Sequence, residues 1–160
     1  MCNELLYRLR RNHGRGSADQ PFLSAACAAA KRAIPHFTYV EECDVTALEE
    51  MRAQLNSARG SRPKLTMLPL LISAICKMVP AFPMINARYD DEAGVVTRHG
   101  SVHLGMAAQT GNGLMVPVVR DAADRDLIDL AAETTRLAGA ARSGTINPSE
   151  LEGGTFSVSA

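Results

Sequence analysis

The sequence lacks net charge, a long apolar run and closely spaced cysteines, and each absence excludes a class of protein. Lys and Arg together number 17, as do Asp and Glu, so the formal net charge is +0 at pH 7. Without a net field the chain has no general electrostatic attraction to nucleic acid or to an anionic membrane. We therefore expect no nucleic-acid or membrane partner, and a ligand that binds at a specific site.

The longest apolar stretch, residues 65–79, is interrupted by Pro69 and Lys77. It is shorter than the roughly 20 residues that a membrane-spanning helix requires. No apolar signal core follows the arginines within residues 1–20, so we do not expect secretion. The stretch is best interpreted as a buried helix.

The four cysteines are too far apart for a CxxC motif or a dense disulfide scaffold. Their spacing favours a reducing, cytoplasmic location. Cys43 and Cys76 have no cationic cluster or helix start near them in the sequence to lower a thiol pKa, so we expect both to be buried packing residues.

The composition is that of an ordinary globular domain, with 46% hydrophobic and 21% charged residues. The first residues are basic and then rich in Gly and Ser, which is typical of a frayed terminus. We therefore predict a basic, flexible head or linker over residues 1–23 and one domain over residues 24–160.

Helical periodicity occurs in four segments. Thr46 and Glu49 have the spacing of a capping box, and Leu48, Met51 and Leu55 would then form one buried stripe. The helix after Thr66 tolerates a proline in its first turn. Predicted helices cover residues 24–32, a segment starting at 46, residues 66–79 and residues 126–142, the last with Leu127, Leu130, Thr134, Leu137 and Ala141 on one side.

Strand-like segments lie between these helices. Residues 37–45 alternate as a half-buried strand does. Two hairpins are predicted over residues 84–98 and 102–120, the second turning at Gly111-Asn-Gly113, and a last strand over residues 155–160. Asn147-Pro148-Ser149-Glu150 has the pattern of one capped turn. Helices mixed with hairpins indicate an α+β fold rather than a regularly alternating parallel sheet.

The four histidines, His13, His36, His99 and His103, do not form a metal-binding pattern, and we predict no metal. His36 is either a hydrogen-bonded structural residue or a ligand contact. No nucleophile elbow, dinucleotide-binding loop or phosphate-binding loop is present, because Gly111-Asn-Gly113 precedes a strand and not a helix.

Longer blocks of sequence resemble one family. Residues 30–52 (AKRAIPHFTYVEECDVTALEEMR), 64–92 (KLTMLPLLISAICKMVPAFPMINARYDDE), 103–122 (HLGMAAQTGNGLMVPVVRDA) and 151–159 (LEGGTFSVS) are similar, in order, to the catalytic domain of the dihydrolipoamide acyltransferases of 2-oxoacid dehydrogenase complexes. The similarity is greatest to the branched-chain type. It runs from about Ala28 to Ala160.

This resemblance implies a chloramphenicol-acetyltransferase-like fold, a two-layer mixed sheet with helices, assembling as trimers and a larger core. It also implies that the active site lies between subunits. There an acyl group passes directly between the thiols of coenzyme A and a dihydrolipoyl arm. The implied partners are further copies of the chain, the dihydrolipoyl domain and the other subunits of the complex.

The resemblance also assigns site residues. Ser159, in the family's GGTFTIS-like strand, would donate a hydrogen bond to the oxyanion of the reacting thioester. Arg52, Thr66 and Gln109 would contact coenzyme A, with the guanidinium suited to a phosphate and the other two to amide groups. The alternative for Arg52 is an ordinary surface arginine, and without the resemblance Ser159 would be a structural serine. Ala160 stands where the family usually has Asn or Ser.

Two parts of the family pattern do not occur in these 160 residues. One is the HxxxDG motif, which supplies the catalytic histidine, and the other is the lipoyl domain that carries the lipoyl group. We therefore expect a domain incomplete at its C-terminus, with an open sheet edge, low stability and little activity of its own. The alternative is a non-catalytic assembly or coenzyme-A-binding module derived from that domain.

Overall fold

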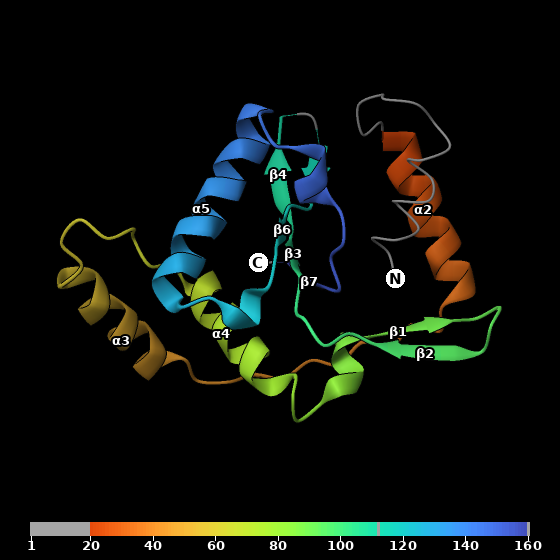
Figure 1. The fold of residues 1–160 in the computed structure, drawn as a ribbon, viewed down its shortest axis with the longest axis horizontal. Helices are drawn as coiled ribbons and strands as arrows, with labels where there is room; N and C mark the ends of the chain where they lie inside the picture. Colours follow the sequence, from red (N-terminus) through yellow and green to blue (C-terminus); the bar gives the residue numbers. More distant parts are fainter. Residues whose placement is uncertain (1–19, 112, 160) are drawn as a thin grey trace.

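The computed structural model describes residues 20–111 and 113–159 (Figure 1). The predicted head up to residue 19, Asn112 of the predicted turn and Ala160 lie outside the described residues. Four α-helices are present in the described part: α2 (Gln20–Ala33), α3 (Thr46–Ser57), α4 (Met67–Met78) and α5 (Leu127–Ser143). α2 begins before the predicted domain boundary at residue 23.

Short strands and 3-10 turns connect these helices. The strands are β1 (Ala87–Asp90), β2 (Val95–Arg98), β3 (Leu104–Met106), β4 (Ala108–Thr110), β5 (Gly113–Met115), β6 (Val118–Val119) and β7 (Phe156–Val158). The 3-10 turns are η1 (Pro83–Asn86), η2 (Ala122–Asp124) and η3 (Pro148–Leu151). None of the described helices is long and apolar enough to cross a membrane.

A three-stranded mixed sheet occupies the centre of the molecule, in the order β6-β3-β7 (Figure 1). β3 pairs antiparallel with β6 and parallel with β7, so that Leu104 lies opposite both Val119 and Phe156. β1–β2 and β4–β5 form two separate antiparallel hairpins. The α+β prediction is confirmed. Helices pack against a mixed central sheet, and the hairpins β1–β2 and β4–β5 lie outside that sheet.

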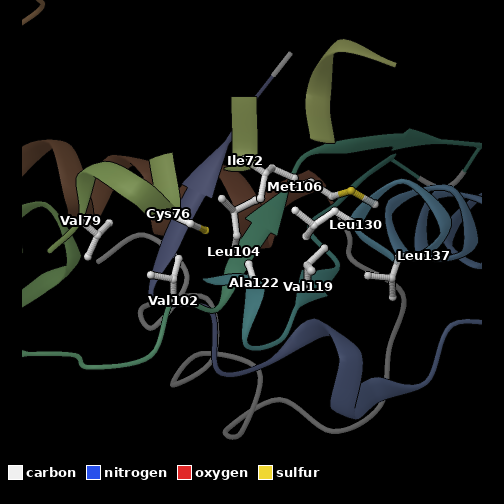
Figure 2. Packing of buried hydrophobic residues seen from close by; sticks show 10 residues of the cluster. All are labelled: Ile72, Cys76, Val79, Val102, Leu104, Met106, Val119, Ala122, Leu130 and Leu137. Atoms are coloured by element: carbon white, nitrogen blue, oxygen red, sulfur yellow. The ribbon is translucent and has the colours of Figure 1, made fainter. Parts of the chain in front are cut away.

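α4 and α5 lie along the sheet and cover one of its faces (Figure 1). Alternate residues of β3, Leu104 and Met106, point toward these helices and are at most 3% exposed. Figure 2 shows them packed with side chains from both helices and from the neighbouring strands. The buried cluster comprises Ile72, Cys76, Val79, Val102, Leu104, Met106, Val119, Ala122, Leu130 and Leu137.

α5 agrees closely with the sequence prediction. Asp126 is its N-cap, and its carboxylate accepts hydrogen bonds of 2.8 Å from the N–H groups of Ile128 and Asp129. Gly144 ends the helix at φ 72°, a left-handed conformation that favours glycine. Four of the five residues predicted on its inner side, Leu130, Thr134, Leu137 and Ala141, are buried, and Leu127 is half-buried.

Two further N-terminal signals were read correctly. Thr66 is the N-cap residue of α4, although its side chain makes no capping hydrogen bond, and Pro69 lies in the first turn. Asn147 and Glu150 form the predicted capping box around η3. α4 has four buried residues but also exposes Leu71 and Met78, so it is less deeply buried than its apolar sequence suggests.

The predicted strand over residues 37–45 is wrong. These residues have no strand pairing, and Phe37, Tyr39 and Val40 are 89%, 77% and 83% exposed. A strand needs a neighbour to satisfy its backbone hydrogen bonds, and no described segment lies beside this one in register. The alternation of side chains predicts only which residues would share a face of a strand. It does not predict whether a neighbouring strand is present to pair with it.

The predicted capping box at Thr46 is also wrong. Val45 is the N-cap residue of α3, and Asp44 accepts hydrogen bonds from both the N–H and the hydroxyl of Thr46. Glu49 pairs with Arg52 instead. The predicted buried stripe is not buried within this chain, since Leu48 is half-buried and Met51 and Leu55 are 42% and 45% exposed.

The first predicted hairpin is confirmed by β1 and β2, whereas the second is divided into two layers. β4 and β5 form its tip, and β3 and β6 pair below them in the central sheet. Breaks occur at Ala107 and at Val116-Pro117. Proline has no N–H to donate, but the carbonyl of Pro117 still accepts from Met106 at 2.9 Å.

Replacing the capping carboxylate is expected to weaken α5. Asp126→Ala leaves two N–H groups at the helix start without their acceptor, and we expect a loss of about 1 kcal/mol in the free energy of unfolding. Denaturant unfolding of the purified chain measures this loss. Asp126→Asn is the control, because it keeps an accepting oxygen; equal losses in both variants would contradict the capping role.

Acidification is expected to remove an ion-pair contribution that joins α5 to η3. Arg136 donates to Glu133 at 2.8 Å and to Glu150 at 2.6 Å, and these hydrogen bonds lower the pKa of both carboxyl groups. A carboxyl whose pKa is lower in the folded state stabilises above its unfolded pKa, and this contribution is lost as the pH falls through the folded value.

Unfolding free energies at pH 7 and pH 3 test this dependence. Glu150→Gln should reduce the stability lost on acidification by about 0.2–1 kcal/mol relative to the unaltered chain. Glu92→Gln, in the exposed turn between β1 and β2, serves as the control. The same acid sensitivity in both variants would show that the pair of Arg136 with Glu150 contributes nothing.

Candidate functional site

Arg52 lies on α3, where that helix meets the segment leading into α4. Its Nε donates to Glu49 Oε2 at 2.8 Å, its Nη2 also donates to Glu49, and its Nη1 donates to the carbonyl of Leu65 at 3.3 Å. The hydrogen bonds from Arg52 lower the pKa of Glu49, and the same bonds raise the pKa of Arg52. Arg52 therefore remains cationic and is held in one orientation.

Thr66 directly follows the carbonyl that Arg52 contacts. Asn56 fixes this carbonyl as well, donating to it at 2.9 Å and accepting from the Leu65 N–H at 2.8 Å. Leu65 itself is 3% exposed and packs with Leu70 and Ala131. The structure thus brings Arg52 and Thr66 together at the start of α4, and the exposed Thr66 hydroxyl makes no capping bond.

Gln109 is the middle residue of β4 and lies opposite Leu114. Its neighbour Ala108 is 6% exposed, whereas Gln109 is exposed. Alternation along the strand therefore turns the Gln109 amide away from the core.

Ser159 follows β7 directly and is exposed. The carbonyl of Val158 accepts from the Ala107 N–H at 3.0 Å, which places Ser159 beside the residues that connect β3 to β4. Gln109 is two residues beyond Ala107, so the sheet brings Ser159 and Gln109 to the same end. The four predicted residues form two groups: Arg52 with Thr66, and Gln109 with Ser159.

His103, the histidine that directly precedes β3, does not lie near Ser159. His103 is opposite Thr155, whose N–H donates to the His103 carbonyl at 2.8 Å, and Ser159 is four residues further along the strand. At 3.3 Å per residue this separates them by ~13 Å, beyond proton-transfer reach. The Nδ1 of His103 also accepts from the Asp121 N–H at 3.0 Å, a structural role.

The other histidines and the thiols do not add a catalytic group to this end of the sheet. His36 is exposed in the segment before α3, and the backbone N–H of His99 donates to Asn86. Cys76 is buried, as predicted, and burial raises its thiol pKa. Cys43 is exposed, contrary to the prediction, because the segment that carries it has no covering partner within the described chain.

One surface hollow of about 560 Å³ lies at the start of α3, lined by Cys43, Asp44, Val45, Thr46, Glu49, Glu50 and Ala53. It is acidic and open, and includes none of the predicted site residues. Within residues 20–111 and 113–159, no group of three or more His, Cys, Asp or Glu is arranged to hold a metal ion. The chemistry available to the predicted residues is hydrogen-bond donation and anion binding.

The signal that sequence reasoning missed is Arg120. Its guanidinium Nη2 donates to the carbonyls of Ser149 at 2.9 Å and Glu152 at 3.1 Å, in the loop that leads into β7. Arg120 follows β6, and the residues that it contacts are about thirty positions later in the chain. Only the tertiary structure shows that they meet. In the sequence, the pair Gly153-Gly154 was the local signal that another group could lie close to the backbone of this loop.

A family model for the catalytic domain of the 2-oxoacid dehydrogenase acyltransferases matches residues 23–160. The lipoamide acyltransferase component of the branched-chain α-keto acid dehydrogenase complex of Pseudomonas aeruginosa is 58% identical over 131 residues, covering 81% of this chain and 31% of that protein. The acetyltransferase component of the pyruvate dehydrogenase complex of Cupriavidus necator is 39% identical over 127 residues, with 79% and 23% covered.

The fold is similar to that of solved acyltransferase cores. A structure of the cubic core of the pyruvate dehydrogenase multienzyme complex superimposes with a TM-score of 0.83 at 32% identity, covering 91% of this chain and 60% of that one. A truncated 2-oxoacid dehydrogenase catalytic core from Thermoplasma acidophilum gives 0.81 at 26% identity, with 89% and 65% covered.

The chain thus spans about a third of the length of the curated branched-chain relatives, within their catalytic domain. Sequence blocks, the family model and the fold of the solved cores all agree over the same residues. The chain belongs to the acyltransferase family of the 2-oxoacid dehydrogenase complexes, and it corresponds to the family's catalytic domain.

Proposed function

We propose that this chain forms part of an acyltransferase that moves an acyl group between a dihydrolipoyl thiol and coenzyme A in a 2-oxoacid dehydrogenase complex of the branched-chain type. The observation that carries the proposal is the position of Ser159. It stands exposed at the end of β7, beside the strand connection that leads to Gln109. A hydroxyl donor is thereby fixed at the edge of a rigid sheet.

The reaction is a thioester exchange. A thiolate attacks the thioester carbonyl, negative charge develops on the carbonyl oxygen, and the other thiolate leaves as the new thioester forms. Ser159 donates a hydrogen bond to that oxygen, and one such preorganised donor contributes about 2.7–4 kcal/mol to the transition state. Each thiol proton passes to or from a base, and His103, ~13 Å away along the sheet, is too far from Ser159 to be that base.

Arg52 and Thr66 supply the coenzyme A contacts at the start of α4. The guanidinium pairs with a phosphate of coenzyme A, which takes the place of the Glu49 carboxylate now bound to it. Thr66 and Gln109 contact amide groups of the pantetheine arm. The lipoyl group is a substrate here, carried on a domain that is not among these residues.

Exposed apolar surface supports self-association. Phe37 and Val40 before α3, and Met51 and Leu55 on it, are each more than 40% exposed. Large apolar side chains that are exposed in one chain are available for burial against another copy. We propose association into trimers and a larger core, in agreement with the cubic core of the similar pyruvate dehydrogenase structure.

A second candidate function is a coenzyme-A-binding or assembly module without acyl transfer. One observation favours it: His103 lies ~13 Å from Ser159 along the sheet. Coenzyme A binding and the transfer assay separate the alternatives, because an ordered oligomer that binds coenzyme A without accelerating transfer favours this module.

Coenzyme A affinity tests the assigned contacts. Arg52→Gln removes a charge-assisted contact to phosphate and should weaken coenzyme A binding by about tenfold or more. Pantetheine, which has no phosphates, should bind Arg52→Gln and the unaltered chain equally. Titration calorimetry with both ligands measures this difference. Arg142→Gln on the exposed end of α5 is the charge-matched control, and an equal loss there would remove Arg52 from the site.

Acyl transfer from acyl-coenzyme A to dihydrolipoamide tests Ser159 itself. We expect the purified chain to accelerate transfer through its oxyanion donor, with a rate that rises about tenfold per pH unit below the thiol pKa as thiolate forms. Ser159→Ala should remove this acceleration, by about 10²–10³-fold.

Ser157→Ala, an exposed serine two residues earlier on β7, is the matched control and should transfer normally. Equal rates for Ser159→Ala and Ser157→Ala would refute the role of Ser159. A rate that is high and independent of pH near neutrality would instead show that the chain supplies a base of its own.

A further inference from the structure

Arg120 joins the two outer strands of the central sheet. It follows β6 directly, and its Nη2 donates to the carbonyls of Ser149 and Glu152, at 2.9 and 3.1 Å, in the segment that leads into β7. β6 and β7 lie on opposite sides of β3. The arginine side chain therefore reaches across the end of β3 from one edge of the sheet to the other.

Gly153 is shaped to receive this guanidinium. It has φ +75°, and a Cβ built on it would lie 3.2 Å from Nη1, 3.4 Å from Nη2 and 3.7 Å from Cζ of Arg120. A side chain at this position would have both an unfavourable backbone conformation and too little space. The glycine thus lets the backbone approach the guanidinium closely, two residues before Thr155.

β7 makes few backbone hydrogen bonds because it is short. It is three residues long, and β3 is its sole strand partner within the described residues. Its alignment begins where the Thr155 N–H donates to the His103 carbonyl at 2.8 Å and the Thr155 hydroxyl accepts from the His103 N–H at 3.1 Å. Phe156 and Val158 pack against the core and decide which face of β7 is buried, and contacts outside the strand add to the alignment of so short a pairing.

The backbone of Arg120 is itself held in place. Its carbonyl accepts from Arg125 Nε at 2.8 Å, and Arg125 is anchored by Asp129 at 2.8 Å on the first turn of α5. The next residue, Asp121, has a left-handed conformation at φ 48°, and its N–H donates to His103 Nδ1. These contacts connect α5, β3 and β6 to the point from which the Arg120 side chain extends.

We propose that Arg120 is a positioning residue for Ser159: by binding the segment 149–153 it fixes the register of β7 on β3, and so places the Ser159 hydroxyl beside Ala107. This inference rests on the proposed function for its catalytic consequence. The side chain acts on the loop and does not touch the reacting atoms. Lys could donate to both carbonyls but lacks the planar group that lies against Gly153, so it should replace Arg120 only in part.

Amide hydrogen exchange tests the register directly. The Ala107 N–H, which donates to the Val158 carbonyl, reports on the end of β7, and the Leu130 N–H, which donates to the Asp126 carbonyl, reports on α5. Arg120→Gln should speed exchange at Ala107 by about tenfold or more and leave Leu130 unchanged. Arg120→Lys should give an intermediate increase, and Arg142→Gln none.

Gly153→Ala perturbs the same contact from the other side, because its Cβ would crowd the guanidinium at 3.2 Å and strain the backbone at φ +75°. It should reproduce the Arg120→Gln pattern. Unchanged exchange at Ala107 in the Arg120 variants, or an equal increase at Leu130, would overturn the proposal, since the first shows no effect on β7 and the second only general loss of stability.

A kinetic measurement separates this inference from the proposed function. In the transfer assay, Arg120→Gln should lower the Ser159-dependent acceleration about tenfold or more while coenzyme A affinity stays unchanged. If the unaltered chain shows no Ser159-dependent acceleration, the proposed function fails, and the exchange at Ala107 still decides whether Arg120 sets the register. Accelerated exchange with full transfer activity would refute the positioning role.

Discussion

The pairing of β3 with strands on both of its sides is the constraint on which the rest of the described structure depends. Leu104 lies between Val119 and Phe156, and the next row joins Gly105 to Val118 and Ser157. Successive side chains point to opposite faces, so this register decides which residues meet the helices. A shift by one residue would bring Ser157 against α4 and α5 and expose Phe156 and Val158.

The same register positions the candidate chemistry. Because the core requires Phe156 and Val158 to face the helices, Ser157 and Ser159 are left on the other face, at the end of the sheet where β4 begins. The hydroxyl of Ser159 thus stays accessible while its backbone is anchored. Burial of one face of β7 therefore leaves the serine hydroxyls on its other face. Arg120 helps to hold β7 by binding the segment that leads into it.

Away from the sheet, the chain leaves much apolar surface uncovered. The segment before α3 and the outer side of that helix expose Phe37, Tyr39, Val40, Met51 and Leu55. Their side chains have the alternation and spacing of buried elements. The pattern of these residues was recognised correctly, but burial also requires a neighbour, and within the described chain none packs on them.

The amino-acid sequence by itself determined the features that rest on near neighbours: α4 and α5, the left-handed end at Gly144, the Asn147 capping box, the β1–β2 hairpin and, through whole-block resemblance, the family. These depend on contacts within a few residues, which local spacing records. Only the tertiary structure decided that residues 37–45 are unpaired, that Asp44 replaces Thr46 as the acceptor at α3, and that Arg120 reaches Gly153. The first and third of these depend on which distant segments of the chain come into contact. The second depends on which of several neighbouring polar groups accepts the hydrogen bond.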